Sequence, residues 1–157
     1  MTTVTTQRTR PAAARHPAVR TMWIGVALAV LATVAPLVDL VTTGTIEGHV
    51  REAYPNWGDD LVGADTTAIT VGLLVLGALG LAGWAVSIWA TARSRRWARG
   101  LASTLFVLGA VVVLFLLTAP AGPYDRMVPV GIGLITALPC VAGLVTVAQL
   151  WQRSVPG

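Results

Sequence analysis

Few residues of this chain could do chemistry, and the sequence keeps them apart. Asp39 is the one ionisable residue inside a long apolar run, where a carboxylate is costly unless it is paired or functional. Its position near the end of that run favours a structural role, as a hydrogen-bonded cap with Thr42 or Thr43 or as an ion pair with Arg51 or Arg126. An ion or proton site at Asp39 is the open alternative.

His49 is the second candidate, because it lies in the polar stretch that holds most of the acidic residues. Its acidic companions are Glu47, Glu52, Asp59, Asp60 and Asp65. A zinc site usually needs three or four nitrogen or sulfur donors in a fixed frame, and these oxygens would suit only weak calcium binding. The single cysteine, Cys140, excludes an intrachain disulfide and is typical of a small buried hydrophobic residue. We therefore predict no metal site and no cofactor.

Catalytic motifs are also missing from the sequence. It contains no GxSxG, no P-loop and no histidine pair inside an apolar run that could hold a haem. We predict no catalytic residue and a non-enzymatic protein. An enzyme or ligand-binding site in the polar stretch is the second alternative.

The composition places the chain in a bilayer. Of its 157 residues 55% are hydrophobic and 11% charged, and the mean hydropathy is +0.72. Crossing the hydrocarbon core takes about 20 apolar residues in a helix. Four runs meet that requirement, at about 22–42, 67–91, 101–119 and 128–150. We predict an all-α fold, a four-helix transmembrane bundle over residues 21–153, with both termini cytoplasmic.

The orientation follows from the arginines. Nine of the eleven fall in segments 1–20, 92–100 and 153–157, with no acidic residue beside them. Loops rich in arginine stay in the cytoplasm, so 1–20 is predicted to be a disordered basic cytoplasmic tail and 154–157 a short cytoplasmic tail. The cytoplasmic anchor is the loop 92–100, with Arg93, Arg95, Arg96 and Arg99. Because these arginines flank apolar spans, the net charge of +4 indicates membrane orientation and no nucleic-acid partner. We predict a multi-pass protein of the bacterial plasma membrane.

The outer loop, 43–66, carries a pattern of its own. Ile46, Val50 and Tyr54 recur every four residues, which predicts a short amphipathic helix lying on the outer surface. The next span is expected to begin near residue 67, after a cap at Asp65.

The first span could also be a signal peptide, cut after Ala35. We expect it to be retained, because the run is long for a signal peptide and Pro36 directly follows the cut.

Small residues mark the second span as a packing helix. Gly80, Gly83 and Ser87 share one face, and small residues let helix backbones approach closely in lipid. We predict that this span is the central helix and that the protein is an accessory or self-associating subunit acting through helix contacts. Its partners would be the lipid bilayer and a second copy or another membrane protein. The alternative is a small oligomeric transporter or channel that uses Asp39.

The four spans, the segment His49-Val-Arg-Glu-Ala-Tyr-Pro55 and the loop Arg95-Arg-Trp-Ala-Arg99 together carry a resemblance. Over about residues 21–153 the chain resembles the small four-span integral membrane proteins of GC-rich bacteria, a group with no assigned activity. The resemblance implies the four-helix topology and no function.

Overall fold

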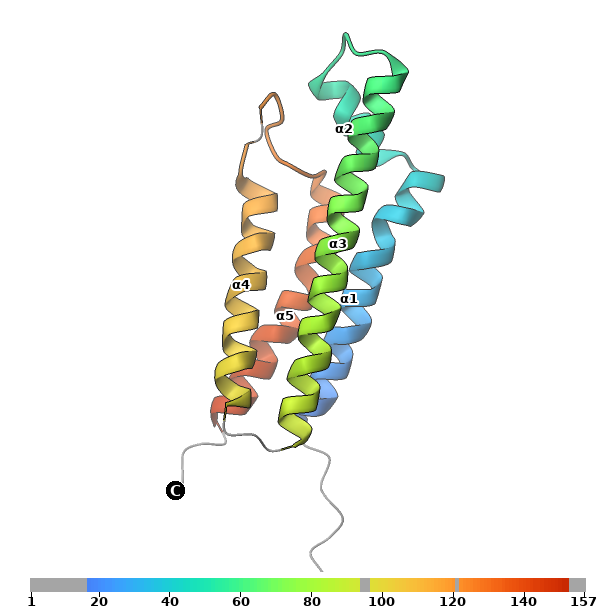
Figure 1. The fold of residues 1–157 in the computed structure, drawn as a ribbon. Helices are drawn as coiled ribbons and strands as arrows, with labels where there is room; N and C mark the ends of the chain where they lie inside the picture. Colours follow the sequence, from blue (N-terminus) through green and yellow to red (C-terminus); the bar gives the residue numbers. More distant parts are fainter. Residues whose placement is uncertain (1–16, 94–96, 121, 153–157) are drawn as a thin grey trace, which may run out of the picture.

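The structure is a computed structural model that describes residues 17–93, 97–120 and 122–152. Its helices are α1 (Pro17–Val41), α2 (Thr45–Ala53), α3 (Asp59–Ala92), α4 (Ala98–Thr118) and α5 (Val130–Gln152). Four long helices run side by side, and α2 sits at one end of the bundle (Figure 1). The predicted all-α class is confirmed.

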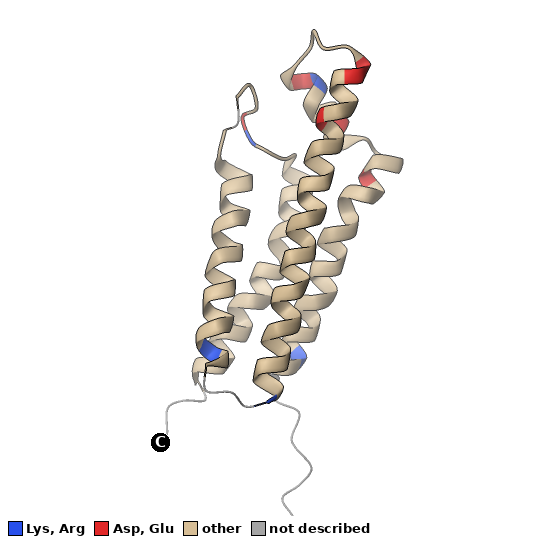
Figure 2. Cartoon of the chain, in the orientation of Figure 1, with Lys and Arg blue, Asp and Glu red and all other residues tan. Residues whose placement is uncertain are grey.

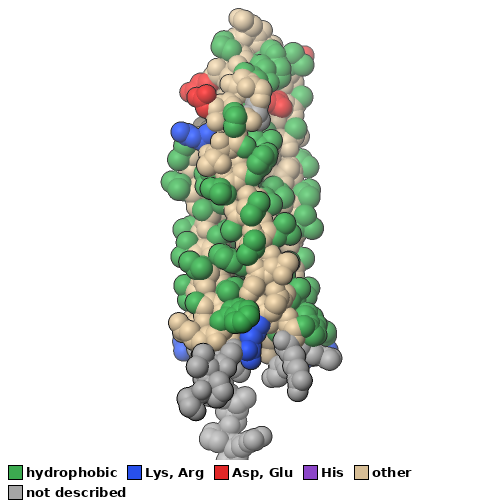
Figure 3. Space-filling view, turned by 90° about the vertical axis from the view of Figure 1, so that its left-hand side faces the viewer, with side chains coloured by type: hydrophobic (Ala, Val, Ile, Leu, Met, Phe, Trp, Pro, Cys, Tyr) green, Lys and Arg blue, Asp and Glu red, His purple; other side chains and the backbone are tan. Residues whose placement is uncertain are grey.

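Four helices are long and apolar enough to cross a membrane. These segments are Val19–Val41, Asp59–Ala92, Ala98–Thr118 and Val130–Gln152. Large apolar side chains project outward along their length (Figure 3), and Leu79, Leu114 and Val141 are each more than 60% exposed. A bundle that presents such side chains to its surroundings is suited to lipid, so these four helices indicate a multi-pass membrane protein.

Three helices, α1, α3 and α4, begin earlier than the sequence predicted. α4 starts at Ala98, within the predicted loop 92–100, so Arg99 lies in its first turn. α3 starts at Asp59, so the prediction that the outer loop extends to residue 66 was wrong. The first turns are helical because Asp59 and Asp60 suit a helix N-terminus and the Val62 side chain is buried. At 34 residues α3 is about 51 Å long, against about 30 Å for the hydrocarbon core, and it extends beyond the other long helices (Figure 1).

α1 begins at Pro17, inside the predicted tail 1–20. The described residues do not include the predicted tail up to residue 16, the anchor residues Arg95 and Arg96, or the predicted tail 154–157.

The central helices are α1 and α5. α1 packs along α5 and α3, and α4 packs along α5; among the neighbouring pairs of long helices, α3 and α4 make the least extensive contact. The prediction that the second span is central was therefore wrong. The physical reason is the distribution of close contacts: α5 meets α4 at Gly143, where an added Cβ would lie 2.9 Å from the Phe106 ring, and the Thr21 hydroxyl of α1 donates to Gln149 of α5 at 3.1 Å.

Contacts between α1 and α3 also depend on glycine. A Cβ at Gly77 would overlap the Thr33 side chain, and one at Gly25 would overlap the Trp84 ring. These two glycines set the distance between the helices, although neither was singled out for this from the sequence.

The short helix α2 forms as predicted, but it docks onto the bundle. Its apolar residues Ile46 and Val50 are 1% and 0% exposed. Ile46 packs with Leu73 of α3 and Ile132 of α5, while Val50 packs with Val62. α2 thus closes the end of the bundle rather than lying on the lipid surface.

Candidate functional site

Asp39 caps the N-terminus of α2. The residue is 4% exposed. Its carboxylate accepts hydrogen bonds from the Thr43 hydroxyl, from the Thr45 backbone nitrogen at 3.0 Å and from the Ile46 backbone nitrogen at 2.9 Å. The first backbone N–H groups of a helix have no partner within the helix. Here each carboxylate oxygen of Asp39 accepts a hydrogen bond from one of them. The turn between α1 and α2 needs Gly44, whose φ of 60° is in the left-handed region. This geometry favours the structural interpretation of Asp39 over an ion or proton site.

Neither arginine proposed as an ion-pair partner of Asp39 is paired with it in the described residues, and Arg51 makes its ion pairs elsewhere. Arg51 bonds to Glu47 and to Asp59, each at 2.9 Å, and joins α2 to the start of α3. Hydrogen bonds to Asp59 and Glu47 raise the pKa of Arg51. The backbone carbonyl of Arg126 accepts a bond from His49 Nε2 at 2.9 Å.

A second polar group, the Tyr124 cluster, consists of Tyr124, Asp65, His49 and Tyr54. The Tyr124 hydroxyl donates to the Asp65 carboxylate, the His49 ring stacks on Tyr124 at 5.1 Å, and the Tyr54 ring meets Tyr124 edge-on at 5.5 Å. Burial, followed by the hydrogen bond to Asp65, raises the pKa of Tyr124. The cluster ties the connection between α4 and α5 to α2 and α3.

The acidic residues do not converge on a metal. Within 17–93, 97–120 and 122–152, no group of three or more His, Cys, Asp or Glu side chains could hold a metal ion. Asp65 and His49 instead serve the Tyr124 cluster. The sequence analysis did not identify Tyr124. A tyrosine in a short connection is typical of a side chain at the membrane interface, and its partner Asp65 lies 59 positions earlier in the chain.

The charges separate along the bundle. The arginines Arg20, Arg93 and Arg99 lie at one end, here called the arginine end, and the described acidic residues gather toward the other, the acidic end (Figure 2). The Arg93 guanidinium lies 4.7 Å from the centre of the Trp89 ring, a cation–π contact. Arg51 and Arg126 belong to the acidic end.

Two of the three small residues predicted for helix packing, Gly83 and Ser87, point into the bundle. Ser87 is 5% exposed, and a Cβ at Gly83 would lie 3.7 Å from Leu105 of α4. A Cβ at Gly80 would meet nothing within 4 Å. All three line a cavity between the helices. Their role in association between chains stays a prediction.

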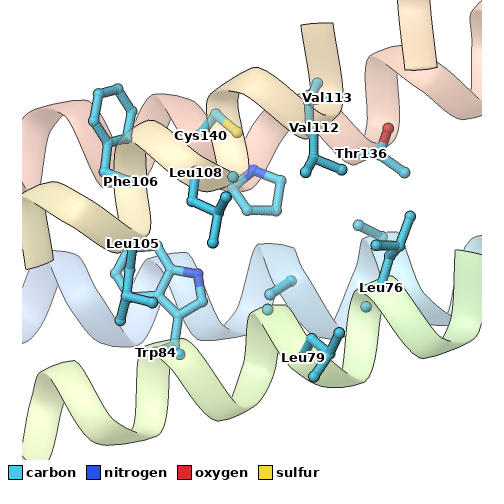
Figure 4. A pocket seen from close by; sticks show the side chains of 18 of the residues that line it. Leu76, Leu79, Trp84, Leu105, Phe106, Leu108, Val112, Val113, Thr136 and Cys140 are labelled. Atoms are coloured by element: carbon cyan, nitrogen blue, oxygen red, sulfur yellow. The ribbon is translucent and has the colours of Figure 1, made fainter. Parts of the chain in front are cut away.

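The cavity has a volume of about 290 Å³. Leu76, Leu79 and Trp84 of α3 form one wall in Figure 4, and Leu105, Leu108 and other α4 side chains face them. Half-buried Cys140 of α5 contributes its thiol. Its lining is almost wholly apolar, which suits binding of an apolar group more than catalysis.

No known protein family, curated protein or solved structure matches this chain. The resemblance to four-span proteins of GC-rich bacteria stays a prediction.

Proposed function

We propose that this chain is a non-enzymatic membrane protein that acts through helix contacts, as an accessory or self-associating subunit. A patch of small residues on the outward face of α3 carries the proposal. Ala78, Ala82 and Ala85 are exposed there, next to the exposed side chains of Val75 and Val86.

These alanines occupy one side of the helix because their spacing is four and three residues. Gly83 and Ser87 lie on the inner side, whereas Ala78, Ala82 and Ala85 are exposed small residues of α3 that a helix outside the bundle can reach. Small side chains permit close approach of two helix backbones, which is the main source of attraction between helices in lipid. The favoured partner is α3 of a second copy.

The proposed setting is the bacterial plasma membrane, with the arginine end in the cytoplasm. This orientation is supported by the arginines of the whole sequence: nine lie in the segments predicted to be cytoplasmic and two in the segments predicted to be outside. Both termini would then be cytoplasmic, with α2 and the Tyr124 cluster on the outer side.

Ala82→Leu tests the proposal in reconstituted bilayers. Against a Cys140→Ser background, Ala78→Cys should crosslink two copies, and adding Ala82→Leu should weaken that crosslinking by about tenfold through loss of close approach. Ala148→Leu is the matched control, because Ala148 is an exposed alanine of α5. Crosslinking that Ala82→Leu leaves intact would show that close approach at the alanine patch does not hold the two copies together. A chain that stays single at every protein-to-lipid ratio and captures no membrane partner would contradict the proposal.

A further inference from the structure

Two of the helices that line the cavity carry glycine there, so part of its wall is backbone without a side chain. A Cβ added at Gly80 of α3 or at Gly109 of α4 would meet nothing within 4 Å, although both residues line the cavity. On α4 the lining runs from Ala102 to Leu116, about 21 Å along the helix. One leaflet of the hydrocarbon core is about 15 Å deep, so the cavity is somewhat longer than the apolar part of one leaflet.

The cavity opens sideways, through the seam between α3 and α4. Its lining includes Leu79 and Leu108, which are 64% and 60% exposed, as well as Met22 and Leu73, which are buried. The exposed pair marks the mouth and the buried pair the floor. In a membrane, the molecules outside this mouth are lipids. An apolar cavity stays dry, and its walls lack contacts until an apolar chain fills it.

One polar group in the cavity has no partner. Thr146 of α5 is 2% exposed, lines the cavity, and its hydroxyl makes no hydrogen bond within the described residues. Ser87 of α3, also buried, lines the same region. Both lie within about two turns of the arginine end, since α5 ends at Gln152 and α3 at Ala92. A buried hydroxyl without a partner is unfavourable, and a ligand with an acceptor at this level would relieve it.

We propose that the cavity binds one acyl chain of a glycerophospholipid from the leaflet at the arginine end. The chain enters between α3 and α4, and its ester carbonyl accepts the hydrogen bond of Thr146. The phosphate of such a lipid faces the end that carries Arg93 and Arg99, whereas the acidic side chains of the described residues gather toward the opposite end (Figure 2). This site lies inside the seam, so it does not depend on the alanine patch proposed for association.

The test uses the full chain in phosphatidylcholine nanodiscs that contain a phosphatidylcholine with a photoreactive diazirine on one acyl chain. We expect labelling of the cavity-lining Leu105 and Val112, which are half-buried, and a loss of about tenfold in Gly80→Phe, whose ring would occupy the space. Gly72→Phe is the matched control. It changes another glycine of α3 with nothing within 4 Å, and Gly72 is not part of the cavity lining.

A second measurement addresses Thr146. Native mass spectrometry should show about threefold more retained diester than diether phospholipid, because only the ester offers a carbonyl, and Thr146→Val should abolish that preference. Label confined to outward side chains such as Val111, or unchanged in Gly80→Phe, would overturn the site. Crosslinks to a second copy across the seam would overturn the choice of lipid as occupant. Equal retention of diester and diether lipid would overturn the contact with Thr146.

Discussion

The carboxylate of Asp39 accepts a hydrogen bond from the backbone nitrogen of Ile46 at 2.9 Å, so the last turns of α1 cap the helix that follows. Ile46 is 1% exposed and packs between α3 and α5. One buried carboxylate therefore orients α2 and holds an apolar anchor in the end of the bundle.

Removing that cap should destabilise the protein. Asp39→Ala leaves the N–H groups of Thr45 and Ile46 without an acceptor, and we expect a loss of about 1–3 kcal/mol in the free energy of unfolding. Denaturant titration of the detergent-solubilised chain, followed by circular dichroism, measures it. Glu52→Ala removes an exposed acidic side chain and should change stability little.

Ion flux separates this structural role from transport. Proteoliposomes with Asp39→Asn should show the same flux as wild type, because the carboxylate is occupied by donors of its own chain. A flux that wild type supports and a folded Asp39→Asn variant does not would contradict the assignment.

The Tyr124 cluster predicts a loss of stability in alkali. The folded state raises the pKa of Tyr124 above its ordinary value of about 10, so folding favours the protonated phenol. The resulting stabilisation is complete below about pH 10 and is lost as the pH rises through the raised pKa. The unfolding midpoint should therefore fall above pH 10, and less steeply in Tyr124→Phe.

The phenolate absorbance provides the direct measurement. The chain has two tyrosines, so Tyr54→Phe leaves Tyr124 as the only phenol. Its ionisation in the folded state should occur above pH 10, and ionisation at or below that value would show that the bond to Asp65 is absent in solution.

Glycine substitutions along α3 should have opposite effects at two positions. Gly77→Ala forces the new methyl group into Thr33 of α1, and we expect a loss of about 1–3 kcal/mol. Gly72→Ala meets open space and should gain up to about 1 kcal/mol, because alanine is the better helix former. Thermal unfolding of the two variants compares them, and equal losses would show that α1 and α3 do not approach at Gly77.

Sidedness can be tested with a membrane-impermeant thiol reagent on intact bacteria. In a Cys140→Ser background, Asp60→Cys should be labelled from outside and Ser94→Cys only after lysis, because the arginine-rich loop stays in the cytoplasm. Labelling of Ser94→Cys in intact cells would reverse the proposed orientation.

The number of spans and the separation of charge could be predicted from sequence, because a bilayer imposes both through local composition. A run of about 20 apolar residues is helical in lipid whatever it packs against, since every backbone group must be bonded within the segment. The short helix over Ile46 and Val50 followed from its spacing for the same local reason. The start of α3 could not be predicted in this way, because its first turns are polar. Their helical conformation depends on the packing of Val62 against Val50 of α2.

Tertiary structure alone decided which groups meet. A count of small residues shows that α3 can pack closely, but the direction in which Gly83 or Ala82 points depends on the rotation of the helix in the bundle. Asp39 lies six and seven positions from the backbone donors it binds, and Tyr124 lies 59 from Asp65, so neither contact leaves a periodic signal. The cavity likewise lies between residues of different helices, among them Gly80 and Gly109, and space between helices becomes visible only when they are assembled.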